Sequence, residues 1–372
     1  MSEILMISKP IVPPYDDSAK NIVFSQVTLG ERHRYRILAT ADAPSPSPRV
    51  TVAPIYGGAG AYSPGLAQNL RVMGYGLRRR GAALYHYFFA PNPVTSTAGR
   101  LQRAITRVKS VQTVCSIPGR FDTINSLLFS DKVIVLSEDT KSRMAAAGVD
   151  ENRLVHIYPG IAPIERADDD TRRRIRQAHG VPDTGAMVLF PGDYEFSSAA
   201  DTVARAVPRL AASFPDLTVV FACRIKRPPS LAERDRIRRR LAEAGLDERV
   251  VFLERVENMP AFVGAADVVV LPSESLFAKM DIPLVLLEAA AQQVPLVLAD
   301  VPPLRELLRY GVGLGVPPAD EAALADAVGQ LLDNKKSATE MGEAGRAAVH
   351  DVFSAKKMAD AVERVYDEVI EQ

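Results

Sequence analysis

Short apolar runs of strand length recur along this chain and alternate with longer amphipathic stretches. The runs are mostly apolar and have the length of strands that helices cover on both faces. Such alternation predicts an α/β fold with parallel sheets and right-handed crossover connections. The predicted strands are residues 4–7, 50–55, 110–114 and 132–136 in the first half, and 187–190, 217–221, 250–253, 267–271 and 295–298 in the second half.

The chain is long enough for two domains. Its 372 residues exceed what one hydrophobic core of ordinary size organises. The first set of units ends at Tyr158-Pro159-Gly160, and a polar stretch follows until the strand that starts at Met187. We therefore expect one α/β domain over residues 1–164 and another over 165–353, facing each other across a cleft. A final amphipathic helix, 354–372, could close either domain or pack back across the cleft.

Charge and cysteine content exclude several classes of protein. Lys+Arg and Asp+Glu both number 45, so the chain lacks the basic excess of most nucleic-acid binders. We expect the arginine run at 172–176 to be the solvated face of a linker helix, which Asp168–Asp170 would cap. The two cysteines, Cys115 and Cys223, are too few and too far apart for a disulfide framework or a zinc site.

The N-terminus and the apolar stretches bear on where the protein works. Glu3 and a short apolar run do not make a signal peptide. No stretch approaches the ~18–20 apolar residues of a membrane span. Few cysteines agree with a reducing compartment. We therefore expect a cytoplasmic protein, and association with a membrane surface stays open.

Ligands of open parallel sheets bind beyond the carboxyl ends of the strands, so the loops there carry the candidate residues. In the first half Asp17 and Ser18 would cap a helix, and Lys20 could meet an anion at its start. Asn92 belongs to a proline-rich loop at the same edge. His86 either contacts substrate or packs as an ordinary buried histidine. Together these five residues form the expected acceptor side.

In the second half the loop 191–198 follows a strand and precedes a helix. Gly192 permits close approach to the backbone beside Asp193, and the helix start could receive a diphosphate. The loop matches neither the P-loop nor the G-x-G-x-x-G pattern, which argues against ATPase and NAD-dependent activities. Arg224 and Lys226 follow the next strand. They either hold a phosphate or belong to an ordinary basic loop.

The stretch 271–300 is the most specific part of the sequence. A buried strand leads into a serine-rich loop, and the helix that follows, PLVLLEAAA, contains one acid, Glu288. A carboxylate in so apolar a helix needs a polar partner. The two hydroxyl groups of a nucleotide ribose would supply it, as in dinucleotide sites.

On these residues the chain resembles the retaining glycosyltransferases of family 4, which have the GT-B fold of two Rossmann-like domains. The resemblance rests on three passages: residues 272–296, with Pro272-Ser273, Glu288-Ala289 and Val294-Pro295; residues 133–161, from a strand through Ser137-Glu138 to Pro159-Gly160-Ile161; and residues 248–273. Together with the order of elements these passages extend the resemblance over nearly the whole chain.

The resemblance implies roles for individual residues. Glu288 is similar to the second acid of the family's Glu-x7-Glu motif and would bind the donor ribose. The first acid falls at Met280, and its neighbour Asp281 could replace it, with Lys279 as a sugar or phosphate contact. Cys115 stands where the family has a histidine, although its surroundings favour a buried, inert thiol. The other expected donor-binding residues are Gly192, Asp193, Arg224, Lys226, Ser273, Pro283 and Leu284.

The resemblance also implies a reaction. The chain would move a hexose-type sugar from a UDP- or GDP-sugar, with retention, to a hydroxyl group of a glycan, a lipid-linked molecule or a small molecule. The nucleotide-sugar is a substrate, and no cofactor is expected. No D-x-D pattern ends a strand, so we expect no metal. Two alternatives remain: a sugar-nucleotide epimerase or hydrolase, and a non-catalytic partner subunit of a glycosyltransferase.

Overall fold

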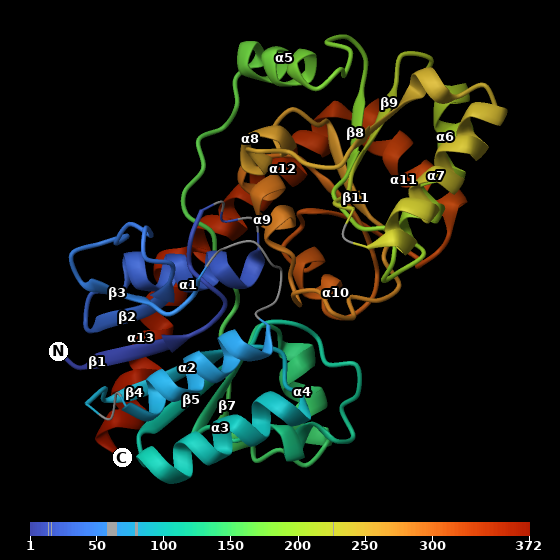
Figure 1. Ribbon diagram of the computed structural model, residues 1–372. Helices are drawn as coiled ribbons and strands as arrows, with labels where there is room; N and C mark the ends of the chain where they lie inside the picture. Colours follow the sequence, from blue (N-terminus) through green and yellow to red (C-terminus); the bar gives the residue numbers. More distant parts are fainter. Residues whose placement is uncertain (14, 16, 58–64, 79–80, 226) are drawn as a thin grey trace. The chain divides into compact units, whose positions relative to one another are not determined.

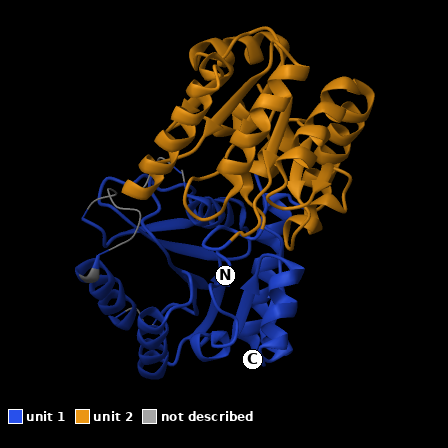
Figure 2. Ribbon diagram, turned by 90° about the vertical axis from the view of Figure 1, so that its right-hand side faces the viewer, with its two compact units in different colours: residues 1–162, 277–281, 353–372 blue, residues 163–276, 282–352 orange. Residues whose placement is uncertain are grey.

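The computed structural model of the chain describes all residues except 14, 16, 58–64, 79–80 and 226. It divides into two compact units (Figure 2). Unit 1 comprises Met1–Ala162, Phe277–Asp281 and Phe353–Gln372, and unit 2 comprises Pro163–Leu276 and Ile282–Val352. Each unit has a parallel sheet with helices, which confirms the predicted α/β fold class.

Unit 1 is built on a seven-stranded sheet in the order β3-β2-β1-β4-β5-β6-β7. Its strands are β1 (Glu3–Ile7), β2 (Arg34–Ala39), β3 (Val50–Pro54), β4 (Leu84–Phe88), β5 (Lys109–Val114), β6 (Lys132–Val135) and β7 (Leu154–His156). Its α-helices are α1 (Ser18–Leu29), α2 (Leu66–Arg78), α3 (Pro93–Thr106), α4 (Glu138–Ala146) and α13 (Ala355–Glu371). Figure 1 shows α2 beside α3, whereas α1 lies with α13.

The C-terminal helix α13 is part of unit 1 because its polar side chains pair with groups of this unit. Glu363 is fully buried, and its carboxylate accepts hydrogen bonds from the Tyr35 hydroxyl at 2.7 Å and from the Arg32 backbone N–H at 2.9 Å. Tyr366 lies in the same core and contacts His86. A buried carboxylate is tolerated only with such partners, so these hydrogen bonds fix α13 on the sheet.

Unit 2 is built on a six-stranded sheet in the order β10-β9-β8-β11-β12-β13. Its strands are β8 (Met187–Phe190), β9 (Thr218–Ala222), β10 (Val250–Leu253), β11 (Val268–Leu271), β12 (Leu296–Ala299) and β13 (Gly313–Val316). Its α-helices are α5 (Asp169–Ala178), α6 (Ala199–Ser213), α7 (Pro228–Glu243), α8 (Met259–Val263), α9 (Leu284–Ala291), α10 (Leu304–Leu308), α11 (Glu321–Asp333) and α12 (Lys335–Asp351). In this unit the predicted strands are confirmed to within one residue at each end.

The predicted linker helix proved to be a packed element. Asp168 caps α5 as expected, accepting the Thr171 N–H at 2.8 Å. The expectation of a solvated arginine face is confirmed for Arg173 and Arg174, which are exposed, but was wrong for Arg176, which is only 5% exposed. Its guanidinium donates to the Asp267 carboxylate at 2.8 Å and to the Ala265 carbonyl at 2.8 and 2.9 Å. These partners precede β11 in the sequence and hold α5 against unit 2.

The order in which strands are added to the sheet of unit 2 reverses between the parallel strands β8 and β11. From β8 the chain continues to β9 on one side, and it returns to β11 on the other side. The carboxyl ends of these two strands therefore mark the place where open α/β sheets bind ligands. In unit 1 the equivalent reversal lies between β1 and β4.

Candidate functional site

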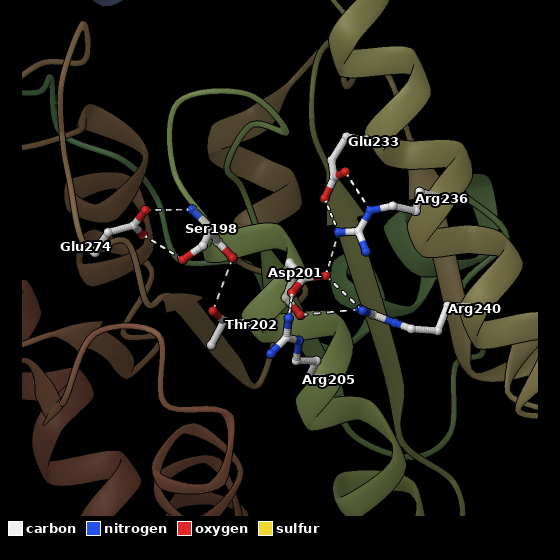
Figure 3. Close-up of polar contacts among 8 residues, drawn as sticks. All are labelled: Ser198, Asp201, Thr202, Arg205, Glu233, Arg236, Arg240 and Glu274. Atoms are coloured by element: carbon white, nitrogen blue, oxygen red, sulfur yellow. Dashed lines mark hydrogen bonds and ion pairs between the residues drawn. The ribbon is translucent and has the colours of Figure 1, made fainter.

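The two loops at the reversal point of unit 2 are joined by a carboxylate. Glu274, in the loop after β11, accepts hydrogen bonds from Ser198, at 2.8 Å from its backbone N–H and at 3.0 Å from its hydroxyl (Figure 3). Ser198 is the N-cap of α6. The sequence predicts that this helix start could receive a diphosphate, and in the structure a side-chain carboxylate takes the place of such an anion. Glu274 was not among the predicted residues.

Glu288 is a second acidic residue near the carboxyl edge of the sheet of unit 2, and it differs from Glu274 in having no partner among the described residues. It lies in the second turn of α9, between the buried Leu287 and Ala289, and it is itself half-buried. Within the described part of the chain, no hydrogen bond or ion pair reaches its carboxylate. Burial alone raises the pKa of Glu288 to about 7. A desolvated carboxylate without a partner is a common mark of a ligand site.

The start of α9 differs from that of α6. No side chain caps α9 at Pro283, and no acid lies in its first turn. Backbone N–H groups at a helix start that no side chain satisfies can bind an anion. Leu284, the first helical residue, is 5% exposed. Ser273 is fully buried, and its hydroxyl donates to the Ser275 carbonyl at 2.8 Å, which shapes the loop that leads to this helix.

The remaining predicted donor residues lie in the loops after β8 and β9. Gly192 has the Phe190 ring where a Cβ atom would be, at 2.1 Å, so a side chain there would collide. Asp193 accepts the N–H groups of Glu195 and Phe196, at 2.9 and 2.8 Å, and thereby closes a turn. Arg224 is half-buried just beyond β9. Lys226 lies outside the described residues.

A second pair that the sequence did not suggest joins these two loops. The carboxylate of Glu195 accepts two hydrogen bonds from Arg227, at 3.0 and 2.8 Å, and one from the Ser230 N–H at 3.1 Å. Hydrogen bonding to Arg227 holds the pKa of Glu195 below its usual range. The pair fixes the loop after β8 to the start of α7.

The predicted catalytic residues Lys279 and Asp281 belong to unit 1 through the segment Phe277–Asp281. The backbone N–H of Ile117, beyond β5, donates to the Lys279 carbonyl at 3.0 Å. Asp281 is fully buried and accepts a hydrogen bond from the Ser137 hydroxyl at the start of α4. The segment thus continues the carboxyl edge of the sheet of unit 1.

Cys115 and Asp17 lie at this same edge. Cys115 is 7% exposed, and burial, with the charges of Asp17 and Asp281, raises the pKa of its thiol. Cys115 therefore stays protonated and is not a nucleophile in this setting. Asp17 caps α1, accepting the N–H groups of Ala19 at 3.0 Å and Lys20 at 3.3 Å.

The ion pair of Asp17 with Lys9, at 2.9 Å, explains its charge state. Burial would raise the pKa of Asp17, but Lys9 and the capped N–H groups outweigh burial, and the pKa lies below its usual value. The α1 start therefore already holds a carboxylate. Ser18 and Lys20, in the first turn, are half-buried.

The other two acceptor-side residues have structural partners. His86 is fully buried, with its ring nitrogens 2.5 Å from the Tyr366 hydroxyl and 2.7 Å from the Thr113 hydroxyl. Burial lowers its pKa well below the ordinary value, so the ring is neutral. Asn92 is exposed and caps α3 through the Thr95 N–H at 3.0 Å. His86 is therefore a packed, hydrogen-bonded histidine, whereas Asn92 is a helix cap whose side chain remains exposed.

Over the residues that the structure describes, no group of three or more His, Cys, Asp or Glu side chains could hold a metal ion. Among the described helices, none combines the length and the apolar character that crossing a membrane requires.

The chain matches one family model and several curated proteins. Residues 171–348 match the family of glycosyl transferases group 1. The chain is 32% identical over 228 residues to a GDP-mannose-dependent alpha-(1-6)-phosphatidylinositol monomannoside mannosyltransferase of Mycolicibacterium smegmatis, over 58% of this chain and 57% of that protein. It is 32% identical over 193 residues to a D-inositol 3-phosphate glycosyltransferase of Acidothermus cellulolyticus, over 50% of this chain and 42% of that protein. The matches thus span about half the length of these relatives.

Solved structures extend the likeness to the fold of the whole chain. A sucrose-phosphate synthase from Thermosynechococcus elongatus has a TM-score of 0.79 at 19% sequence identity, with 100% of both chains covered. Anabaena HepE in complex with UDP and glucose has a TM-score of 0.78 at 17% identity, with 99% of this chain and 100% of that chain covered. At these identities the likeness shows a GT-B-like fold. Residues 171–348 match the family model of the glycosyl transferases group 1, and the fold of the chain resembles that of the solved GT-B structures.

Proposed function

We propose that this chain is a retaining glycosyltransferase that moves a hexose-type sugar from a nucleotide-diphosphate donor to a hydroxyl acceptor without a metal ion. The observation that carries the proposal is Glu288, a half-buried carboxylate with a pKa raised to about 7 and no partner among the described residues. The hydroxyl groups of a ribose would donate to it and relieve the cost of its burial. Its place within the matched family region supports this role.

The donor diphosphate would lie near the start of α9, which no side chain caps. Backbone N–H groups there and the Arg224 guanidinium would stabilise the negative charge that grows on the leaving diphosphate as the bond to the sugar breaks. Lys226 and Lys279 are the other cations that the sequence suggests for the donor phosphates. Stabilisation of the leaving group by fixed donors is the main catalytic contribution that unit 2 would make.

The predicted catalytic residues of unit 1 would act in different ways. Asp281 is buried and hydrogen-bonded to Ser137, and Cys115 is a buried thiol with a raised pKa. We assign both to positioning the segment Phe277–Asp281. Lys279, in the same segment, would contact the sugar or a phosphate of the donor. Transfer itself would then depend on correct placement of the acceptor hydroxyl rather than on a nucleophilic side chain of this chain.

The relatives suggest which substrates to test first. One is named as GDP-mannose-dependent and as acting on a phosphatidylinositol monomannoside, and another as a D-inositol 3-phosphate glycosyltransferase. We propose GDP-mannose as the first donor and inositol-containing lipids or inositol phosphates as the first acceptors. A lipid acceptor would bring the enzyme to a membrane surface.

Binding of nucleotides to matched variants tests the donor site. Calorimetric titration with GDP and with UDP would compare the wild type, Glu288→Gln and Glu243→Gln, the last an exposed acid at the end of α7. We expect Glu288→Gln to weaken binding of the preferred nucleotide by about tenfold, because a charged acceptor of two hydrogen bonds is lost. Glu243→Gln should bind as the wild type does. Equal affinity of all three proteins would refute the ribose contact.

A transfer assay tests the reaction. The protein would be incubated with radiolabelled GDP-mannose or UDP-glucose, with and without phosphatidylinositol or inositol 3-phosphate. Labelled acceptor supports glycosyl transfer, whereas free labelled sugar or an epimerised donor, formed equally without acceptor, would mean a hydrolase or an epimerase. If neither nucleotide binds, both enzymatic functions are excluded and a non-catalytic partner subunit remains.

A further inference from the structure

A pocket of about 820 Å³ opens at the edge of unit 1 opposite to the one described above. It lies where α3 ends and where β5, β6 and β7 begin, whereas Cys115 and Ser137 follow the ends of β5 and β6. In a parallel sheet these are opposite edges. The pocket is lined by Arg100, Arg103, Ala104, Arg107, Val108, Lys109, Leu128, Phe129, Ser130, Asp131 and Arg153.

The lining is strongly basic for a chain with no net charge. It contains four arginines and one lysine, and Asp131 is its one acid. Asp131 pairs with Arg103 and also accepts the Ser110 N–H at 2.8 Å. One carboxylate offsets one of the five positive charges, so about four remain uncompensated within the pocket.

Apart from the ion pair of Arg103 with Asp131, three of the arginines donate hydrogen bonds to backbone carbonyl groups, which do not cancel their charge. Arg103 donates to the Phe129 carbonyl, and Arg153 donates to the Ser130 carbonyl at 2.9 Å. Arg100 donates to the carbonyl of Ser126. Neutral carbonyl groups orient the guanidinium groups and leave further N–H donors for a ligand.

The pKa of Arg153 reflects this concentration of positive charge. Partial burial lowers its pKa, and the charges of Arg103 and Arg100 lower it further, whereas the charges of Asp150 and Asp131 oppose this shift without reversing it. An arginine stays protonated in proteins. The free-energy cost of holding the charge of Arg153 partly buried beside other cations therefore remains until an anion binds near it.

Ser130 gives a second, independent sign of a ligand. It is 1% exposed and lines the pocket, and its hydroxyl has no hydrogen-bond partner in the described structure. A buried hydroxyl without a partner is uncommon and calls for a missing acceptor or donor. A hydroxyl donor beside several guanidinium groups is the donor set that binds phosphate oxygens.

We propose that this pocket is an anion site for a phosphate-bearing ligand, separate from the donor and acceptor sites. Its volume accommodates a diphosphate or a phosphate ester with part of its organic group, which Val108, Leu128 and Phe129 would contact. The ligand is either a free phosphorylated metabolite or the headgroup of a phospholipid. The second source is included because α3 also carries three exposed apolar side chains, Val94, Leu101 and Ile105, which are 74%, 50% and 44% exposed.

Two substitutions remove charge from the pocket at low cost to the fold. Arg107 ends α3 with φ 56°, in the left-handed region that glycine adopts without strain. Arg107→Gly therefore removes a cation and relieves strain at once. Arg153→Met removes a second cation and keeps an apolar stem. Arg34→Gln, at an exposed arginine that begins β2, is the matched control.

The soluble ligand class is tested with inorganic pyrophosphate on the full chain. Hydrogen exchange followed by mass spectrometry separates this pocket from the donor site, because it reports on individual peptides. We expect pyrophosphate to protect peptides that cover residues 99–110, 128–131 and 151–154. Titration should show about a tenfold loss of affinity at this site for Arg107→Gly and for Arg153→Met. Arg34→Gln and Glu288→Gln should leave this protection unchanged.

The lipid source is tested by flotation with phosphatidylcholine vesicles that contain or lack phosphatidic acid. Flotation that requires phosphatidic acid and is lost in Arg107→Gly and Arg153→Met identifies a headgroup as the ligand. Protection by pyrophosphate without flotation identifies a soluble ligand. The proposal is overturned if neither probe binds, or if both pocket variants bind as well as Arg34→Gln does. It stands or falls independently of glycosyl transfer.

Discussion

Ser137 donates a hydrogen bond to the carboxylate of Asp281, which lies 144 residues further along the chain and is fully buried. The Ser137 hydroxyl also accepts the Thr140 N–H at 3.0 Å and so caps α4. The Ser137 hydroxyl group therefore has two roles. It caps α4, the helix that follows β6, and it donates a hydrogen bond to the buried carboxylate of Asp281. The segment Phe277–Asp281 is fixed to unit 1 by this contact and by the Ile117–Lys279 backbone hydrogen bond.

Loss of the Ser137 hydroxyl should destabilise unit 1 strongly for so small a change. Ser137→Ala removes the cap and leaves a buried carboxylate without this donor, so we expect the free energy of unfolding to fall by about 2–3 kcal/mol. Ser126→Ala is the control, because that exposed hydroxyl donates only to the local Thr123 carbonyl. Urea denaturation measures both. Equal stability of the two variants would contradict the structural role of the contact.

Ionisation of Glu288 should lower the free energy of unfolding of the ligand-free protein, although the ionised form is the one that would bind a ribose. Its pKa is raised from 4.5 to about 7, so the folded state favours the protonated form. Between pH 4.5 and 7 the folded protein keeps a proton that the unfolded chain releases, and the free energy of unfolding falls as the pH rises. Glu288→Gln never ionises and avoids this loss. We expect it to be more stable than the wild type at pH 8, by on the order of 2 kcal/mol, and equally stable at pH 4.

Thermal denaturation without nucleotide at pH 4, 6 and 8 checks this expectation. The stability difference between Glu288→Gln and the wild type should grow along that series. A variant that is less stable than the wild type at pH 8 would mean that the carboxylate has a stabilising partner in the folded state.

Binding of an uncharged nucleoside should respond to the same ionisation in the opposite sense. Ribose hydroxyl groups donate to the ionised Glu288, so the protein must release its proton before it binds. With a pKa of about 7, guanosine or uridine affinity should rise about tenfold from pH 6 to pH 8 and then level off. Nucleosides avoid titration of the phosphate groups. A pH-independent affinity in the wild type, or the same pH dependence in Glu288→Gln, would exclude this ionisation as the cause.

Local patterns in the sequence were sufficient for much of the fold. The apolar runs at β8 and β11 became strands in which every residue is buried, and Asp17 and Asp168 became helix caps. Glu288 was also evident locally, because an acid in an apolar helix is conspicuous without any knowledge of its neighbours. These features depend on residues within one turn or one strand.

Features that depend on distant partners were not predictable from the sequence. Glu274 reaches Ser198 across 76 residues, and Tyr366 reaches His86 across 280 residues. The strand β13 was missed because Gly313 and Gly315 weaken the strand pattern. Gly313 is required there, since a Cβ atom would lie 1.9 Å from the Leu296 carbonyl oxygen. The sequence shows that position 313 is a glycine, but only the fold shows why a side chain is excluded there.

The arginines of α5 give a direct comparison between a buried and an exposed site on one helix. Arg176 donates to Asp267, Ala265 and the Gly185 carbonyl, the last at 3.0 Å, and is 5% exposed. Arg174 is exposed and bonds only within the helix. Arg176→Met should lower the free energy of unfolding by about 3 kcal/mol or more, because the carbonyl groups and part of the Asp267 carboxylate lose their donor.

Arg174→Gln should change stability by less than about 0.5 kcal/mol. Arg176→Lys should recover only part of the loss, since an ammonium group at that position cannot serve three acceptors in the geometry of a guanidinium fork. Guanidinium chloride denaturation of the three variants decides whether α5 is a solvated linker helix or a packed part of unit 2. Similar stabilities for Arg176→Met and Arg174→Gln would mean that α5 is the solvated linker that its sequence suggests. A loss confined to Arg176→Met, partly restored by lysine, requires α5 to be a packed part of unit 2.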